Sequence, residues 1–166
     1  MIYEAWRCAF TRRWHCNADL HDTFDPILGH SGRMALVGMM IWPGDDALLR
    51  ACILHDVPEG ITGDIPSPSI NHEMRDLKER REQDARSALQ LPVMDRSARV
   101  TARLDFLDKL DAYLYAIHTR PRLQFRKEWT SAFDRLWDLA TAAKCVDELS
   151  AIIDGQSQYL VDWHHL

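Results

Sequence analysis

Glycine and proline are scarce in this chain, with seven of each among 166 residues, and runs in which β-branched and polar residues alternate are missing. β-Sandwiches and β-barrels need frequent turn residues and alternating strands, so the sequence excludes these classes. No uncharged apolar run approaches the roughly 18 residues of a membrane-spanning helix. The first ten residues also carry Glu4 and Arg7, so we expect neither export nor membrane insertion.

Cysteines with the spacing of metal ligands are also lacking. Cys8, Cys16, Cys52 and Cys145 include no pair separated by two residues, which argues against a zinc ribbon. Cys52 lies in the apolar run 51–54 and is expected to be a core residue. We therefore expect a reduced, cytoplasmic protein.

The chain has no excess of positive charge. It contains 20 Lys and Arg residues against 25 Asp and Glu residues, which gives a formal net charge of −5. Such a chain has no general electrostatic attraction to a nucleic acid polymer or to an anionic membrane. Any anionic ligand must therefore be bound by cations gathered at one place.

Helical periodicity runs along most of the sequence. With 46% hydrophobic residues and no visible linker or repeat, it predicts one all-α domain over residues 1–166, with about six to seven helices. The expected helices cover residues 2–12, 31–42, 46–55, 71–91, 95–118, 125–143 and 146–164, and Asp45 or Asp46 is expected to cap the third. Residues 17–29 are expected to be a polar loop and residues 56–68 to be irregular.

The helix expected over 95–118 carries acidic residues on an otherwise apolar face. Helical spacing places several alanines on the same helix face as Asp105, Asp108 and Lys109. Burying a carboxylate is unfavourable unless its charge is compensated, so this face calls for a functional explanation. The neighbouring Asp111 is expected to be a solvated helix position.

The His55-Asp56 dipeptide gains its meaning from its position. Chance alone predicts about one His-Asp dipeptide in a chain of this composition. However, His55 ends an apolar helix and Asp56 begins the Pro- and Gly-rich turn, so both side chains lie where a core meets a cleft. The second such dipeptide, His21-Asp22, has no such frame and is interpreted as part of a solvated loop.

His30 can join His55 at one metal ion. The two histidines stand at the start of the second expected helix and the end of the third, and in an antiparallel hairpin these ends face the same side. Asp108 or a neighbour could complete a shell of two nitrogen and two oxygen ligands. Such a shell suits Mn, Fe, Co, Ni or Zn better than Ca or Mg.

Four segments together resemble the HD-domain metal-dependent phosphohydrolases. They are RRW at 12–14, GHSGRMA at 29–35, HDVPEGITGDIPSP at 55–68 and FLDKLDAYL at 106–114. More closely, they are similar to the bacterial HD-domain 5′-deoxynucleotidases and the related small phage deoxynucleoside triphosphohydrolases. The resemblance implies a helical HD fold, a homodimer, and one divalent transition metal held by His30, His55, Asp56 and Asp108.

The resemblance also implies roles around the metal. Glu59 would be the partner of the attacking water, and Asp64 would be a carboxylate of the catalytic site or one that contacts the sugar. Arg13 and Trp14 would contact the phosphate and the deoxyribose. These roles agree with general chemistry, because a carboxylate can take a proton from water and a guanidinium fork matches a phosphate.

The chain departs from the family pattern at two positions where the family has lysine. Ile70 and Asp105 occupy them, so other cations must meet the phosphate. The candidates are Lys109, Lys78, Arg75 and Arg80. The remaining histidines find no motif partner and are expected to be exposed or to cap helices: His15, His72, His118, His164 and His165.

The expected reaction is cleavage between the 5′ oxygen and the α-phosphorus of a deoxynucleotide. We expect a deoxynucleoside monophosphate to give deoxynucleoside and phosphate, because few cations are visible for a longer phosphate chain. The alternative is a deoxynucleoside triphosphate, such as dATP, that gives deoxynucleoside and triphosphate. A second alternative is a non-catalytic HD module that binds a nucleotide, but such a module has no need of Glu59.

Overall fold

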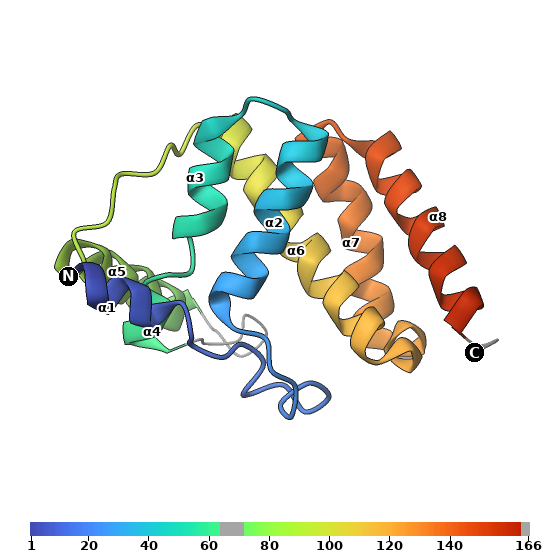
Figure 1. Ribbon diagram of the computed structural model, residues 1–166, viewed down its shortest axis with the longest axis horizontal. Helices are drawn as coiled ribbons and strands as arrows, with labels where there is room; N and C mark the ends of the chain where they lie inside the picture. The colour runs from blue at the N-terminus through green and yellow to red at the C-terminus, as the bar shows by residue number, and fades with distance from the viewer. Residues whose placement is uncertain (64–71, 164–166) are drawn as a thin grey trace. The chain divides into compact units, whose positions relative to one another are not determined.

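The computed structural model describes residues 1–63 and 72–163. Within these ranges the chain forms helices and no strand, which confirms the all-α prediction. The helices, labelled in Figure 1, are α1 (Ile2–Cys8), α2 (Ile27–Ile41), α3 (Asp46–Leu54), α4 (Glu59–Thr62), α5 (His72–Ala88), α6 (Ala98–Thr119), the 3-10 helix η2 (Pro121–Phe125), α7 (Lys127–Ala143) and α8 (Val146–Trp163). None of the helices in the described ranges combines the length and apolar character needed to cross a membrane.

The helix ends differ from the prediction mainly near the expected loops. The first helix stops at Cys8 instead of residue 12, because Arg12 pairs with Pro26 in an isolated antiparallel bridge. The second helix begins at Ile27, four residues early, because Pro26 lacks an N–H and suits a helix start. The segment expected to be irregular contains the short helix α4, which raises the helix number.

The chain divides into two compact units, each built from two segments. The first unit contains residues 1–35 and 49–95, and the second contains 36–48 and 96–166. The boundary between the units passes through α2 and α3 rather than through a linker. The single domain expected over the whole chain stays a prediction.

In the second unit, α6 packs against α7, and α7 packs against α8 (Figure 1). Phe106, Leu110, Leu136 and Leu149 are fully buried between these helices. Asp111 is buried too, with 8% of its surface exposed, so the expectation of a solvated position was wrong. The reason is that α6 buries residues around most of its circumference, and position 111 lies beside Leu107 and Leu110.

Asp45 ties the start of α3 to α6 within the second unit. Its carboxylate accepts the Leu48 N–H at 3.2 Å, as expected for a helix cap, and also binds Arg99 and Arg103, the latter at 2.6 Å. Arg103 in turn lies over the Trp42 ring, 4.7 Å from its centroid. Burial tends to raise the pKa of Asp45, but the hydrogen bonds from Arg103, Leu48 and Arg99 outweigh it and hold the pKa below the ordinary value.

This ion pair predicts a pH-dependent loss of stability in Asp45→Asn. At pH 7 the variant should lose about 1–2 kcal/mol of unfolding free energy, because charged hydrogen bonds are lost. A carboxylate whose pKa is depressed by folding stabilises the protein above its unfolded pKa of 3.8, and this contribution disappears as pH falls through the lower folded pKa. Urea unfolding should therefore show that the difference in unfolding free energy between the wild type and Asp45→Asn is smaller in acid than at pH 7. The exposed Asp46→Asn is the control.

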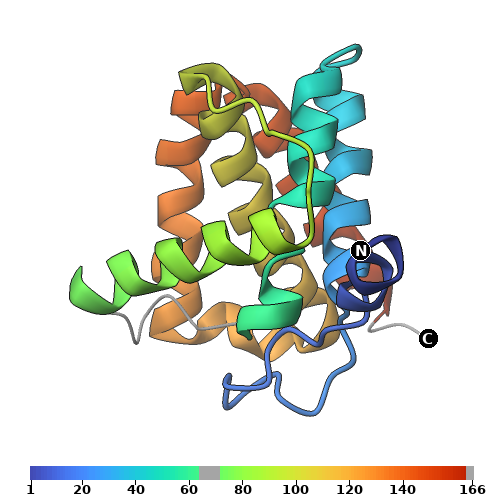
Figure 2. The same cartoon turned by 90° about the vertical axis from the view of Figure 1, so that its left-hand side faces the viewer.

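In the first unit, α4 packs against α1 and α5 (Figure 2). Gly60 makes the approach to α1 possible, because a Cβ atom at this position would lie 2.7 Å from the Cys8 Cα atom. Ala85 and Leu89, at the end of α5, are buried. The short helix α4 is therefore held between α1 and α5, which fixes the position of its first residue, Glu59.

Candidate metal centre

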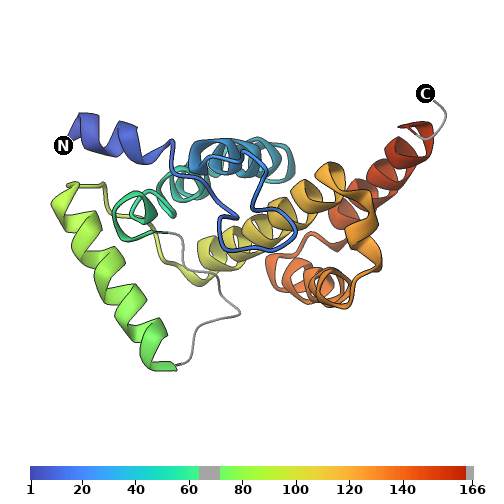
Figure 3. The same cartoon turned by 90° about the horizontal axis from the view of Figure 1, so that it is seen from below.

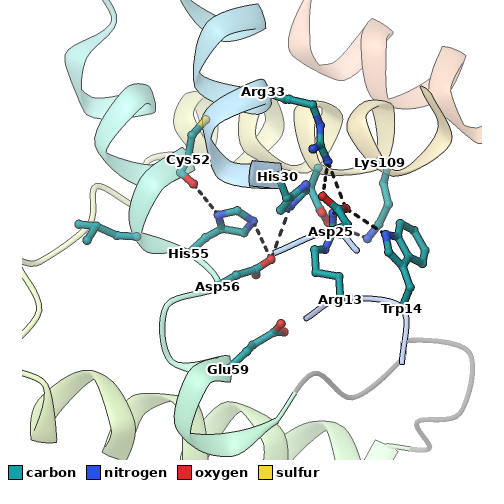
Figure 4. Close-up of polar contacts among 12 residues, drawn as sticks. Arg13, Trp14, Asp25, His30, Arg33, Cys52, His55, Asp56, Glu59 and Lys109 are labelled. Carbon is teal, nitrogen blue, oxygen red and sulfur yellow. Dashed lines mark hydrogen bonds and ion pairs between the residues drawn. The ribbon is translucent and has the colours of Figure 1, made fainter. Parts of the chain in front are cut away.

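His30, His55 and Asp56 come together in the first unit (Figure 4). One potential ligand atom from each lies within 4.8 Å of the others. The Asp56 Oδ2 atom is 3.2 Å from His55 Nε2 and 3.5 Å from His30 Nε2. His30 is fully buried in the first turn of α2, whereas the side chains of His55 and Asp56 are 12% and 18% exposed. Three of the four predicted ligands are thus gathered at one place.

The tautomer of His55 suits a metal ligand. Its Nδ1 atom lies 2.9 Å from the carbonyl oxygen of Cys52, and because a carbonyl oxygen can only accept, Nδ1 carries the hydrogen. In the neutral ring the lone pair is then on Nε2, the atom that faces Asp56. A hydrogen bond of this kind fixes the ring orientation of histidine ligands in metal sites.

Arg86 on α5 fixes the backbone of the same histidine. Its Nη2 atom donates to the carbonyl oxygens of His55, at 2.6 Å, and Leu54, at 3.1 Å. These carbonyl groups lie at the C-terminal end of α3, where helices leave acceptors without helical partners. This role could not be predicted from the sequence, because Arg86 belongs to a strongly charged helix.

The donor set fits a divalent transition metal. Two imidazole nitrogens and a carboxylate oxygen are ligands that Mn, Fe, Co, Ni and Zn accept, whereas Ca and Mg prefer oxygen alone. His30, His55 and Asp56 could therefore hold such an ion. The identity of the metal stays a prediction.

Asp108, the predicted fourth ligand, belongs to α6 in the second unit. Its Oδ2 atom is 2.7 Å from Nζ of Lys109, and the two side chains are 24% and 44% exposed. Burial and the charge of Asp108 raise the pKa of the nearby Asp105. The ligand role of Asp108 and the substrate role of Lys109 stay predictions.

Glu59 is the first residue of α4 and is 7% exposed. Its backbone N–H donates to the Asp56 carbonyl at 2.9 Å, so it follows that residue by one tight turn. Lys78 on α5 reaches Glu59 Oε1 at 3.2 Å and Glu82 Oε1 at 3.4 Å. Burial lowers the pKa of Lys78, but Glu59 and Glu82 outweigh it and raise the pKa above its ordinary value. Lys78, one of the candidate phosphate partners, is thus engaged with Glu59.

Arg13 and Trp14 follow Arg12, whose bridge to Pro26 closes the loop between α1 and α2. Figure 3 shows this loop as the blue trace between the two helices. Both are half-buried, and both side chains reach Asp25, which is fully buried. Arg33, three residues after His30, binds the same carboxylate. Neither Asp25 nor Arg33 was predicted as a site residue, although Arg33 lies within the segment GHSGRMA and one helical turn from His30.

The other candidates give no site in the described part of the chain. Asp64, Ile70, His164 and His165 lie outside the described residues. His21 and Asp22 are exposed, as are His15, His118, Arg75 and Arg80, which agrees with the solvated interpretation of the loop dipeptide. His118 stacks on Tyr159, and His72 begins α5. Cys52 is buried as predicted, and none of the four cysteines forms a disulfide bond.

The comparisons with known proteins identify the family. The family model described as HD domain matches residues 9–153, which include the three gathered ligands and Asp108. No curated protein and no solved structure shows a significant match to the chain. HD domains generally bind divalent metals and act as hydrolases, in agreement with the His-Asp cluster. Because the match covers most of its length, the chain belongs to the HD domain family.

Proposed function

We propose that the protein is a phosphohydrolase that cleaves the bond between the 5′ oxygen and the α-phosphorus of a deoxynucleotide. The observation that carries the proposal is the convergence of His30, His55 and Asp56, with Glu59 one turn further along the chain. Figure 4 shows the Glu59 side chain on the same side of this turn as Asp56. This arrangement combines a metal-binding group with a carboxylate base.

The chemistry divides between the metal and the chain. His30, His55 and Asp56 would hold the divalent ion, and when bound it would supply Lewis-acid polarisation of a phosphoryl oxygen and make water more acidic. Glu59 takes the proton from the attacking water at its Oε atoms. Arg13 offers a planar fork to the phosphate, and Trp14 covers the sugar. The water oxygen bonds to phosphorus as the bond from phosphorus to the 5′ oxygen breaks. The 5′ oxygen leaves as the hydroxyl group of the nucleoside, and the proton that it gains balances the one that Glu59 takes from the water.

We favour a monophosphate substrate over a triphosphate. Among the cations that the sequence offered, Lys78 is paired with Glu59, and Arg75 and Arg80 are exposed on α5. These arrangements leave few cations for a long phosphate chain. Both substrates would be cleaved at the same bond, so the difference lies in the released group.

Product analysis tests the proposal. The purified protein is incubated, with Mn or Co, with deoxy- and ribonucleoside mono- and triphosphates. We expect deoxynucleoside and inorganic phosphate from the deoxy monophosphates. Release of intact triphosphate would establish the alternative substrate. Nucleotide binding without any product would overturn the enzymatic proposal in favour of a binding module.

A further inference from the structure

The loop between α1 and α2 is closed by contacts that do not involve the side chain of Asp25. Arg12 and Pro26 form the bridge at its base, and Arg12 Nη2 donates to the carbonyl oxygens of Thr23, at 2.8 Å, and His21, at 3.2 Å. Asn17 Oδ1 accepts two backbone N–H groups inside the loop. Leu20 is fully buried and anchors the loop to the unit. A further closing device is therefore not needed.

Asp25 instead organises three side chains. Its Oδ1 and Oδ2 atoms are 2.9 and 3.1 Å from Arg33 Nη2, and Oδ2 accepts the indole N–H of Trp14 at 3.0 Å. Arg13 Nη1 lies 3.7 Å from Oδ2, and the Arg13 N–H donates to the Asp25 carbonyl at 2.9 Å. Only 1% of the Asp25 side chain is exposed. A carboxylate buried to this degree requires partners of opposite charge, and here two arginines provide them.

The backbone of Trp14 is strained in a way that supports a functional role. Its φ angle is 67°, in the left-handed region that a bulky residue rarely adopts. Such conformations persist where the surroundings hold them, often at binding sites. Here the Asp25 hydrogen bond holds the indole, and the Arg13 guanidinium lies 5.1 Å from its ring centroid.

Arg33 is placed to act beside the metal cluster. It follows His30 by three residues on α2, and side chains at this spacing share a helix face. Its side chain is 40% exposed, whereas that of Arg13 is 12% exposed. Both Asp25 contacts are made by the Nη2 atom of Arg33, so the carboxylate fixes one corner of the guanidinium and the group still reaches solvent.

We propose that Asp25 is the positioning residue of the substrate site, and that it holds Arg13 and Arg33 as a pair of guanidinium groups that bind the phosphate of a phosphomonoester. This inference rests on the proposed function. Arg33 takes the place of the lysines that the chain lacks at positions 70 and 105. The phosphate meets the two guanidinium groups and not the carboxylate, because only 1% of the Asp25 side chain is exposed, against 12% of Arg13 and 40% of Arg33.

Asp25→Asn and Arg33→Gln test this arrangement. Asparagine keeps the shape and one acceptor for the Trp14 indole but cannot balance two guanidinium groups. We expect both variants to raise the KM for a deoxynucleoside monophosphate by about 10- to 100-fold, the range for a lost charged hydrogen bond, with kcat within about threefold. Arg33→Lys keeps the charge and should recover part of the affinity. The controls are Asp22→Asn in the same loop and Arg50→Gln on α3, both exposed residues.

A second measurement does not depend on turnover. Calorimetric titration of each metal-loaded variant with inorganic phosphate should show the Kd rising at least tenfold in Asp25→Asn and Arg33→Gln and unchanged in the controls. If this holds while no nucleotide is hydrolysed, the proposed function fails and the anion site stands. If nucleotides are hydrolysed but phosphate affinity and KM are unchanged in both variants, the inference is overturned. Should Asp25→Asn fail to fold by circular dichroism, Arg33→Gln decides alone.

Discussion

Replacing His55 by alanine should abolish metal binding and turnover while leaving the protein folded. His55 is the best ligand to replace because its side chain is 12% exposed, whereas His30 is fully buried and its loss would open a larger cavity. A metal that polarises the phosphoryl group contributes several kcal/mol to the transition state, so the rate should fall on the order of 10³-fold. Metal analysis and circular dichroism of the same sample measure both effects.

The chain provides a matched control in its other His-Asp dipeptide. His21 is exposed, and like His55 its Nδ1 atom contacts a carbonyl oxygen, that of Ala18 at 3.1 Å. His21→Ala should therefore keep full metal content and activity. Full metal occupancy in His55→Ala would contradict the assignment of this cluster as the metal centre.

Asp108→Ala extends the same experiment to the fourth ligand. If Asp108 completes the shell, its alanine variant should lose most of the bound metal, because three ligands remain. Full occupancy would place the fourth ligand elsewhere, with Asp105 and Asp111 as the next residues to replace. Asp111 is buried in α6, so its replacement is also expected to affect the stability of the protein.

The helices could be predicted where apolar residues recur at helical spacing and a capping residue marks the helix start. Ser97 caps α6 by accepting the Val100 N–H, and Asp45 caps α3, so both starts were predicted to within a few residues. The start of α2 was not predicted, because the polar residues 17–29 were interpreted as one loop, whereas Pro26 directly precedes the first helical residue, Ile27. Residue 12 was assigned to a helix because its pairing partner, Pro26, is distant in sequence.

The metal cluster could be predicted because two of its residues are adjacent and the third begins a neighbouring helix. Asp25, Arg33 and Arg86 could not, since each acts through a contact with a residue 8 or more positions away. Charged residues in a polar loop or a charged helix look solvated in sequence. Only the fold shows that Asp25 is fully buried and that Arg86 reaches the end of α3.

Replacing Glu59 by glutamine should separate catalysis from binding. Glutamine keeps the size of the side chain but cannot accept the proton of the attacking water. Because Glu59 is outside the cluster of metal ligands, we expect full metal content, a KM within a few fold of the wild type, and a kcat lower on the order of 10²- to 10⁴-fold. Steady-state kinetics and metal analysis check the three quantities together.

Glu82→Gln is the control, because it removes the other ion-pair partner of Lys78. Lys78 lies 3.2 Å from Glu59 and 3.4 Å from Glu82, so either variant takes one negative charge from the same ammonium group. If Glu59 serves only to hold Lys78 and to cap the turn at α4, the two variants should lose similar activity and stability. If Glu59 is the base, only its variant loses turnover, and Glu82→Gln stays within about threefold of the wild-type kcat. Activity of Glu59→Gln close to that of Glu82→Gln would therefore remove Glu59 from the catalytic machinery and leave it as the residue that joins α4 to α5.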